Sequence, residues 1–170
     1  MAWQRYALLD CGADPQLHPA LFDHRMRSGL RARGLLERQP EAAHANKGPW
    51  LLEVPTQQAN PELVRWLIHV GHQAPCLAWL AAEVPFDALF DHLEAQLDLA
   101  LPDGGLAMMR FWDPRAFYRL QRILTPGQLL ALLGPVLEWQ IALAGRPMHV
   151  RREDLKRSRQ EQDAHAGTHP

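Results

Sequence analysis

The chain has 170 residues, enough for one domain with a buried core, and its 47% hydrophobic and 22% charged residues are typical of a globular protein. Its formal net charge of −1 provides no general attraction to phosphate backbones, so we expect no nucleic-acid partner. No stretch approaches the roughly 18 apolar residues of a membrane span, and the first residues lack a signal-peptide pattern, so we expect a cytoplasmic protein without a membrane partner.

The first part of the chain alternates between short apolar runs and helical patterns. The runs that predict strands are residues 6–9, 35–36, 48–55 and 76–80. The spacing of apolar residues predicts helices over 15–26, 61–70 and 86–97, with a loop over 41–47. The two cysteines, Cys11 and Cys76, fall in or beside the apolar runs, which favours small buried side chains over a disulfide. Strands that alternate with helices predict parallel pairing.

The second part of the chain has a different pattern. Residues 99–101 and 106–111 predict an antiparallel hairpin around Asp103-Gly104, followed by a helix over 114–124. The capping-box-like segment Thr125-Pro126-Gly127-Gln128 predicts the start of another helix, and strands are predicted over 137–143 and 148–150. The predicted fold class is therefore α/β (α+β): a mixed β-sheet with parallel core strands, flanking helices and antiparallel hairpins. We expect one domain over residues 1–150 and a charged C-terminal tail over 151–170, helical near its start and frayed after about residue 160.

A strand-to-helix corner is predicted at Asp113-Pro114, after the hairpin. The aspartate can cap free backbone N–H groups, and proline at the first helical position loses no hydrogen bond. Arg110 and Arg115 bracket this aspartate, so we expect a buried or half-buried ion pair.

A metal site would need three or four ligands, and only His69, His72 and Cys76 are close in sequence. Gly71 and Pro75 would interrupt a helix between the histidines and the cysteine. We therefore expect exposed histidines at a helix end and no metal.

An acid–base set is the strongest catalytic candidate, and its members are Asp10, Asp14, Asp23 and His24. No nucleophile in a strained turn and no phosphate-binding loop accompanies them, so we predict no enzyme and no cofactor. A small enzyme remains an alternative, for which turnover lost in His24→Ala or Asp10→Ala would be the evidence.

Two features are typical of binding surfaces. Arg115, Arg119 and Arg122 form a basic stripe along one helix face, which is either solvated or faces an acidic partner. The chain also has six tryptophans, most of which are predicted in elements and hence in the core. One or two can still line a groove, because tryptophan is enriched in binding hot spots.

Four blocks of residues make a combination that is more specific than any one of them. They are Tyr6-Ala7-Leu8-Leu9-Asp10, Gly48-Pro49-Trp50-Leu51-Leu52-Glu53, Leu101-Pro102-Asp103-Gly104 with Arg110-Phe111-Trp112-Asp113-Pro114-Arg115, and Leu133-Gly134-Pro135-Val136 with Trp139. With these blocks the chain resembles the type VI secretion effector-adaptor (chaperone) family, also called domain of unknown function 4123, over roughly residues 5–150. Trp112 stands where the family more often has tyrosine.

The resemblance implies a non-enzymatic cytoplasmic adaptor of a Gram-negative bacterium. Such an adaptor binds a cognate secreted effector, a toxin, and helps to load it onto the spike-tip protein. Many members have a larger helical C-terminal lobe where this chain has its charged tail. The candidate protein-binding residues are Trp112, Arg115 and Trp139, with Arg119 and Arg122. The alternative is a small ligand-sensing or immunity-like binding module, which the products of the neighbouring genes would distinguish.

Overall fold

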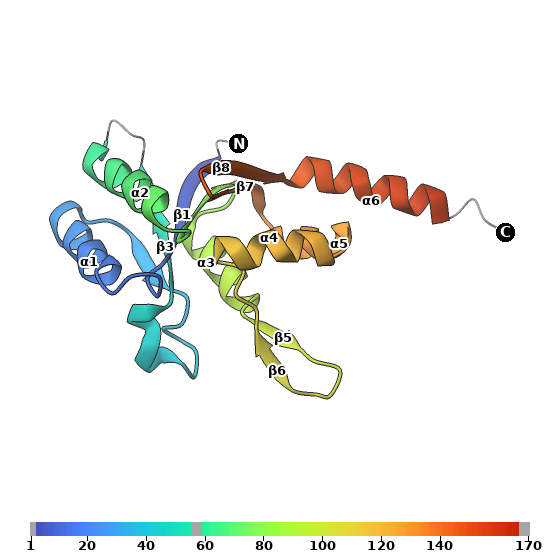
Figure 1. Ribbon diagram of the computed structural model, residues 1–170, viewed down its shortest axis with the longest axis horizontal. Coiled ribbons are helices and arrows are strands. Elements are labelled where there is room, and N and C mark those ends of the chain that lie inside the picture. Colours follow the sequence, from blue (N-terminus) through green and yellow to red (C-terminus); the bar gives the residue numbers. More distant parts are fainter. Residues whose placement is uncertain (1–2, 56–58, 167–170) are drawn as a thin grey trace.

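A six-stranded sheet forms the centre of the computed structural model, which describes residues 3–55 and 59–166 (Figure 1). Its order is β2-β3-β1-β4-β7-β8, and a separate hairpin pairs β5 with β6. The strands are β1 (Gln4–Asp10), β2 (Ala32–Gly34), β3 (Pro49–Glu53), β4 (Leu77–Ala82), β5 (Asp98–Ala100), β6 (Leu106–Met108), β7 (Val136–Leu143) and β8 (Arg146–Arg151). The helices are α1 (Leu17–Ser28), the 3-10 helix η1 (Ala42–Lys47), α2 (Pro61–Gln73), α3 (Phe86–Ala95), α4 (Pro114–Ile123), α5 (Pro126–Leu133) and α6 (Arg152–Ala166).

All neighbouring strands in the described part of the sheet are antiparallel, so the predicted parallel core strands were wrong. The reason is that a helical connection between two strands passes over one intervening strand of the sheet. β1 and β2 both run antiparallel to β3, and β3 and β4 both run antiparallel to β1. The units β1–α1–β2 and β3–α2–β4 thus each join two strands of like direction, as their sequence patterns predict, but a third strand lies between the two. The fold is α+β.

Side chains of the sheet point alternately to two hydrophobic layers, because successive residues of a strand face opposite sides. On one side, the apolar residues of the sheet pack against α3, α4 and α5, and on the other side against α1 and α2. Tyr6 and Leu8 belong to the first layer, and Ala7 and Leu9 to the second. Figure 1 shows the sheet between the two groups of helices, with the β5–β6 hairpin and α6 extending from this body.

The predicted hairpin and helix starts are confirmed. β5 and β6 pair around a turn in which Gly104 has a φ of 83°, although β6 ends before residues 109–111. The side chain of Asp113 accepts a hydrogen bond from the backbone N–H of Arg115 at the start of α4. Thr125 and Gln128 form the expected capping box of α5.

Several boundaries differ from the sequence predictions. The second strand is β2, and the predicted residues 35–36 follow it as buried members of the core. The loop over 41–47 contains η1, and the tail is helical to Ala166 rather than to about residue 160. Cys11 and Cys76 are free and buried as expected, one residue outside β1 and β4. Burial raises the pKa of Cys76 to about 11.

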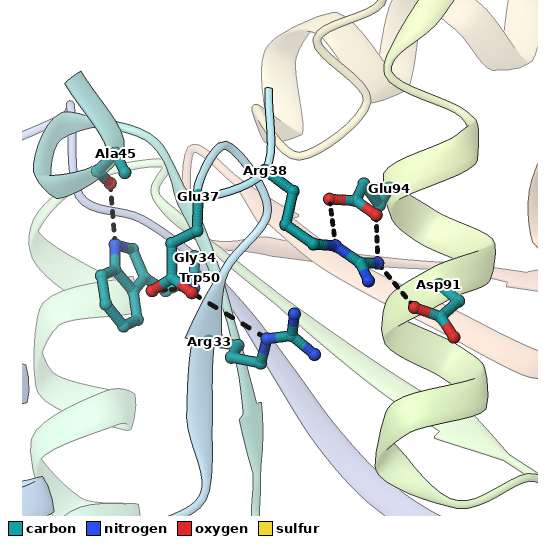
Figure 2. A network of polar contacts seen from close by, with 8 residues as sticks. All are labelled: Arg33, Gly34, Glu37, Arg38, Ala45, Trp50, Asp91 and Glu94. Carbon is teal, nitrogen blue, oxygen red and sulfur yellow. Dashed lines mark hydrogen bonds and ion pairs between the residues drawn. The ribbon is translucent and has the colours of Figure 1, made fainter. Parts of the chain in front are cut away.

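A polar network holds the segment after β2 against α3 (Figure 2). The guanidinium of Arg38 binds Glu94 and lies 2.6 Å from an oxygen of Asp91, both on α3. Hydrogen bonds from these two carboxylates hold the pKa of Arg38 above its ordinary value. The guanidinium carbons of Arg33 and Arg38 lie 3.9 and 5.2 Å from the ring centroid of Phe90. Charge pairing and ring contacts therefore join this edge of the sheet to α3.

Candidate functional site

Residues from the four sequence blocks come together in the fold. The first two blocks pair as strands, with Leu9 opposite Trp50. The third and fourth meet through their aromatic rings, because Phe111 lies edge-on to Trp139 with 6.0 Å between the centroids. Phe117 of α4 stacks on the same indole at 4.6 Å. The aromatic residues of these blocks therefore build the core that orients α4 on the sheet.

The five predicted binding residues separate into two groups. Trp139 is 0% exposed and Trp112 is 4% exposed, so both are core side chains without surface for a partner in this structure. They therefore do not form the exposed docking surface that the sequence suggested, because Trp139 packs against Phe111 and Phe117 and Trp112 lies edge-on to Phe111 within the same core. Arg115, Arg119 and Arg122 are exposed on α4.

Four charged residues form what we call the charged corner: Asp10 at the end of β1, and Arg110, Asp113 and Arg115 around the start of α4. Arg115 binds Asp113 with two side-chain hydrogen bonds, of 3.0 Å from Nε and 2.9 Å from Nη2. Nη2 of Arg110 lies 3.6 Å from Asp113 Oδ2 and 3.9 Å from Asp10 Oδ2. The ion pair predicted from sequence is confirmed, and Asp10 joins it from 100 residues away.

The two carboxylates of the charged corner have opposite pKa shifts. Burial alone would raise the pKa of Asp113, but hydrogen bonds from the side chain and backbone of Arg115 outweigh burial and lower it. Burial raises the pKa of Asp10, against the N–H of Gly12 and the charge of Arg110, which favour its ionised form. Asp113 is thus held as an anion, whereas the protein environment disfavours the ionised form of Asp10.

An apolar groove of about 720 Å³ opens beside the charged corner, where α2 ends. Its main apolar lining comes from Ile68, Leu77, Trp79, Ile141, Leu143 and Pro147. Arg115 lies on its rim, so the groove and the charged corner share a residue. The sequence analysis missed this groove, because its walls come from three separate segments. Its only sequence signal was Trp79, a tryptophan in a predicted strand that turns out to be half-buried.

The other candidate sites do not assemble. His24 packs against Trp66 with 4.8 Å between ring centroids, and burial lowers its pKa. Across residues 3–55 and 59–166, no hydrogen bond or ion pair joins His24 to Asp10. The same ranges contain no group of three or more His, Cys, Asp or Glu residues placed to hold a metal ion. None of the helices in the described part of the chain is long and apolar enough to span a membrane.

Comparison with known proteins identifies one family. The model of the family described as "Domain of unknown function (DUF4123)" matches residues 5–131, which is most of the chain. The chain therefore belongs to this family. The match includes β1 to α4 and the charged corner, and ends within α5, before the Leu133-Gly134-Pro135-Val136 block. Neither the curated proteins nor the solved structures contain a significant match.

Proposed function

We propose that this DUF4123 chain is a non-enzymatic adaptor that binds a type VI secretion effector and helps to load it onto the spike-tip protein. Two arguments support the proposal. The chain belongs to the family whose resemblance implies this role. The observation that carries the argument is the apolar groove beside the charged corner, because it offers a partner an apolar pocket with a cation on its rim.

The groove has the size and lining of a recognition site. Its volume lies within the roughly 300–1,000 Å³ of typical ligand pockets. A protein interface of standard size buries roughly 800 Å² on each partner, so the groove would be the centre of a larger contact. Trp79 lies in its wall, and tryptophan is prominent among residues that dominate binding energy. We infer that an apolar side chain of the effector is inserted here.

The chemistry of the groove favours binding over catalysis. His72 and Arg115 are its ionisable lining residues, and neither is paired there with a carboxylate that lines the groove. Arg115 is instead held by Asp113, outside the lining. General acid–base catalysis needs a positioned side chain, and in the described residues no hydrogen bond or ion pair orients His72. An ion-paired arginine stays charged and does not exchange protons.

Co-expression tests the proposed function. The chain is tagged and expressed with the products of its neighbouring genes, then captured and analysed by size-exclusion chromatography. We expect a toxin-like protein, alone or with a spike-tip protein, to co-elute and to be soluble only in the presence of this chain. A lone monomer beside unbound neighbours would contradict the adaptor role.

A variant that fills the groove connects the partner to this site. Ala142 is exposed and lines the groove, so Ala142→Trp should block an inserted side chain with little effect on folding. Ala88→Trp, at an exposed position on α3 across the sheet, is the matched control. We expect capture of the partner to fall at least about tenfold for Ala142→Trp only, the loss of one buried anchor. Equal capture by both variants would exclude the groove.

A small ligand-sensing or immunity-like module is the second candidate, and the groove volume is the observation that favours it. A thermal-shift screen with small apolar acids, which match the apolar wall and Arg115, distinguishes the two. Saturable stabilisation of the chain alone, lost in Ala142→Trp, would favour the module.

A further inference from the structure

The outward face of α4 carries a stripe of arginines between two exposed apolar side chains. At about 100° per residue, Arg115, Arg119 and Arg122 point within about 60° of one another. Tyr118 and Ile123 flank them on either side, and Ile123 is 73% exposed. We call this set of three arginines the arginine stripe.

The positive charge of the arginine stripe is largely uncompensated. Helix α4 contains no acidic residue, and only Arg115 has a carboxylate partner, Asp113. In the described ranges Arg119 and Arg122 form no ion pair, although the guanidinium of Arg122 lies 5.8 Å from the ring centroid of Tyr118. The whole chain has a net charge of −1, so this is a local concentration of cations.

The arginine stripe lies on a helix that packs on the core, and it is continuous with the apolar groove. The opposite face of α4 packs into the core through Phe117, which stacks on Trp139. Arg115 belongs to both the stripe and the rim of the groove. From Arg115 to Arg122 the helix rises about 10 Å, which corresponds to two turns of a partner helix.

We propose that the arginine stripe binds an acidic, amphipathic segment of a partner protein, with carboxylates on the arginines and apolar side chains against Tyr118 and Ile123. This inference rests on the proposed function in that the partner segment would belong to the effector. Charge complementarity selects an acidic occupant, because planar guanidinium groups bind carboxylates with two hydrogen bonds. The exposed apolar flanks favour a polypeptide over a phosphate polymer, which would leave Ile123 in water.

A designed peptide tests this surface without knowledge of the effector. The probe is a fluorescein-labelled helical peptide of about 12 residues, with glutamate at positions i, i+4 and i+7 and leucine on the flanking positions. The control peptide has the same sequence with glutamine in place of each glutamate. Fluorescence anisotropy with the full chain should show saturable binding of the acidic peptide, weaker with added salt and much weaker for the glutamine peptide.

Charge reversal locates the binding to α4. The double variant Arg119→Glu, Arg122→Glu should weaken binding of the acidic peptide about tenfold or more, since two ion pairs become repulsive. The pair Arg119→Lys, Arg122→Lys should retain most of the affinity. The matched control, Arg27→Glu with Arg159→Glu, changes net charge equally at exposed positions on α1 and α6 and should bind as the unchanged chain does. Circular dichroism verifies that each variant is folded.

The outcomes separate this inference from the proposed function. If a toxin-like partner co-elutes and the Arg119→Glu, Arg122→Glu chain captures it equally well, the arginine stripe is not the docking site and the adaptor role stands. If the peptide binds as predicted and no neighbouring product co-elutes, the surface is supported and the secretion role fails. Binding of an oligothymidylate or of phosphatidylserine vesicles at least as tightly as the acidic peptide would overturn the choice of a protein partner.

Discussion

Replacement of Asp113 by alanine tests how the charged corner contributes to stability. Asp113 is 6% exposed, and its carboxylate makes two kinds of contact. Its Oδ1 accepts the backbone N–H of Arg115 at 2.9 Å, which caps α4, and its two oxygens accept hydrogen bonds from the guanidinium of the same arginine. Asp113→Ala removes both, whereas Asp113→Asn keeps an oxygen that can cap the helix.

The expected magnitudes follow from the geometry. Loss of a helix N-cap costs about 1 kcal/mol, within a range of roughly 0.5–2. The ion pair adds little, about 0–1 kcal/mol, because the side chain of Arg115 is 60% exposed and water screens the charge. We therefore expect Asp113→Ala to lower the free energy of unfolding by about 0.5–3 kcal/mol at pH 7, and Asp113→Asn by less than about 1 kcal/mol.

Urea denaturation followed by tryptophan fluorescence measures both variants. The lowered pKa of Asp113 also predicts a pH dependence. Its contribution is present above the ordinary aspartate pKa and is lost as the pH falls through the lowered folded-state value, so the difference between the unchanged chain and Asp113→Asn should shrink in strong acid. Equal losses for the alanine and asparagine variants would refute the separation of cap from charge. A loss for alanine below about 0.3 kcal/mol would refute the capping role altogether.

Three further substitutions probe the surroundings of the site. Trp139→Ala, which removes the fully buried indole stacked on Phe117, should cost about 3–5 kcal/mol in urea denaturation, and a loss below about 1 kcal/mol would contradict its place in the core. Gly134→Ala should lower the melting temperature by several degrees, measured by calorimetry, because φ is 52° and a Cβ would lie 2.2 Å from the ring of His92. Because the pKa of Asp10 is raised in the folded chain, the contribution of this carboxyl group to the free energy of unfolding is present at low pH and is lost as the pH rises through the folded-state pKa. The Asp10→Asn variant should therefore become more stable relative to the unchanged chain from pH 4 to pH 7. Urea denaturation at both pH values would show the opposite trend if Arg110 dominated the electrostatics of Asp10.

Local signals in the sequence determined the short-range structure. The Asp113-Pro114 and Thr125-Pro126 pairs predicted helix starts correctly, because a side-chain oxygen caps the N–H groups of its own next residues. The Asp103-Gly104 turn was also predicted, since glycine allows the positive φ. These interactions span a few residues, so no knowledge of the rest of the chain is needed.

The tertiary structure alone decided the direction of the strands and the exposed surface. A strand–helix–strand pattern indicates that its two strands run in the same direction, but it does not reveal whether a third strand lies between them. Parallel pairing was therefore predicted for β1 with β2 and for β3 with β4, although β3 lies between the first two strands and β1 between the second two. The sequence suggested Trp112 and Trp139 as binding residues, but both side chains are buried in the packed core. The groove and the link from Asp10 to Arg110 join segments distant in sequence. Burial and long-range pairing depend on the whole packed chain, whereas caps and turns depend on their neighbours.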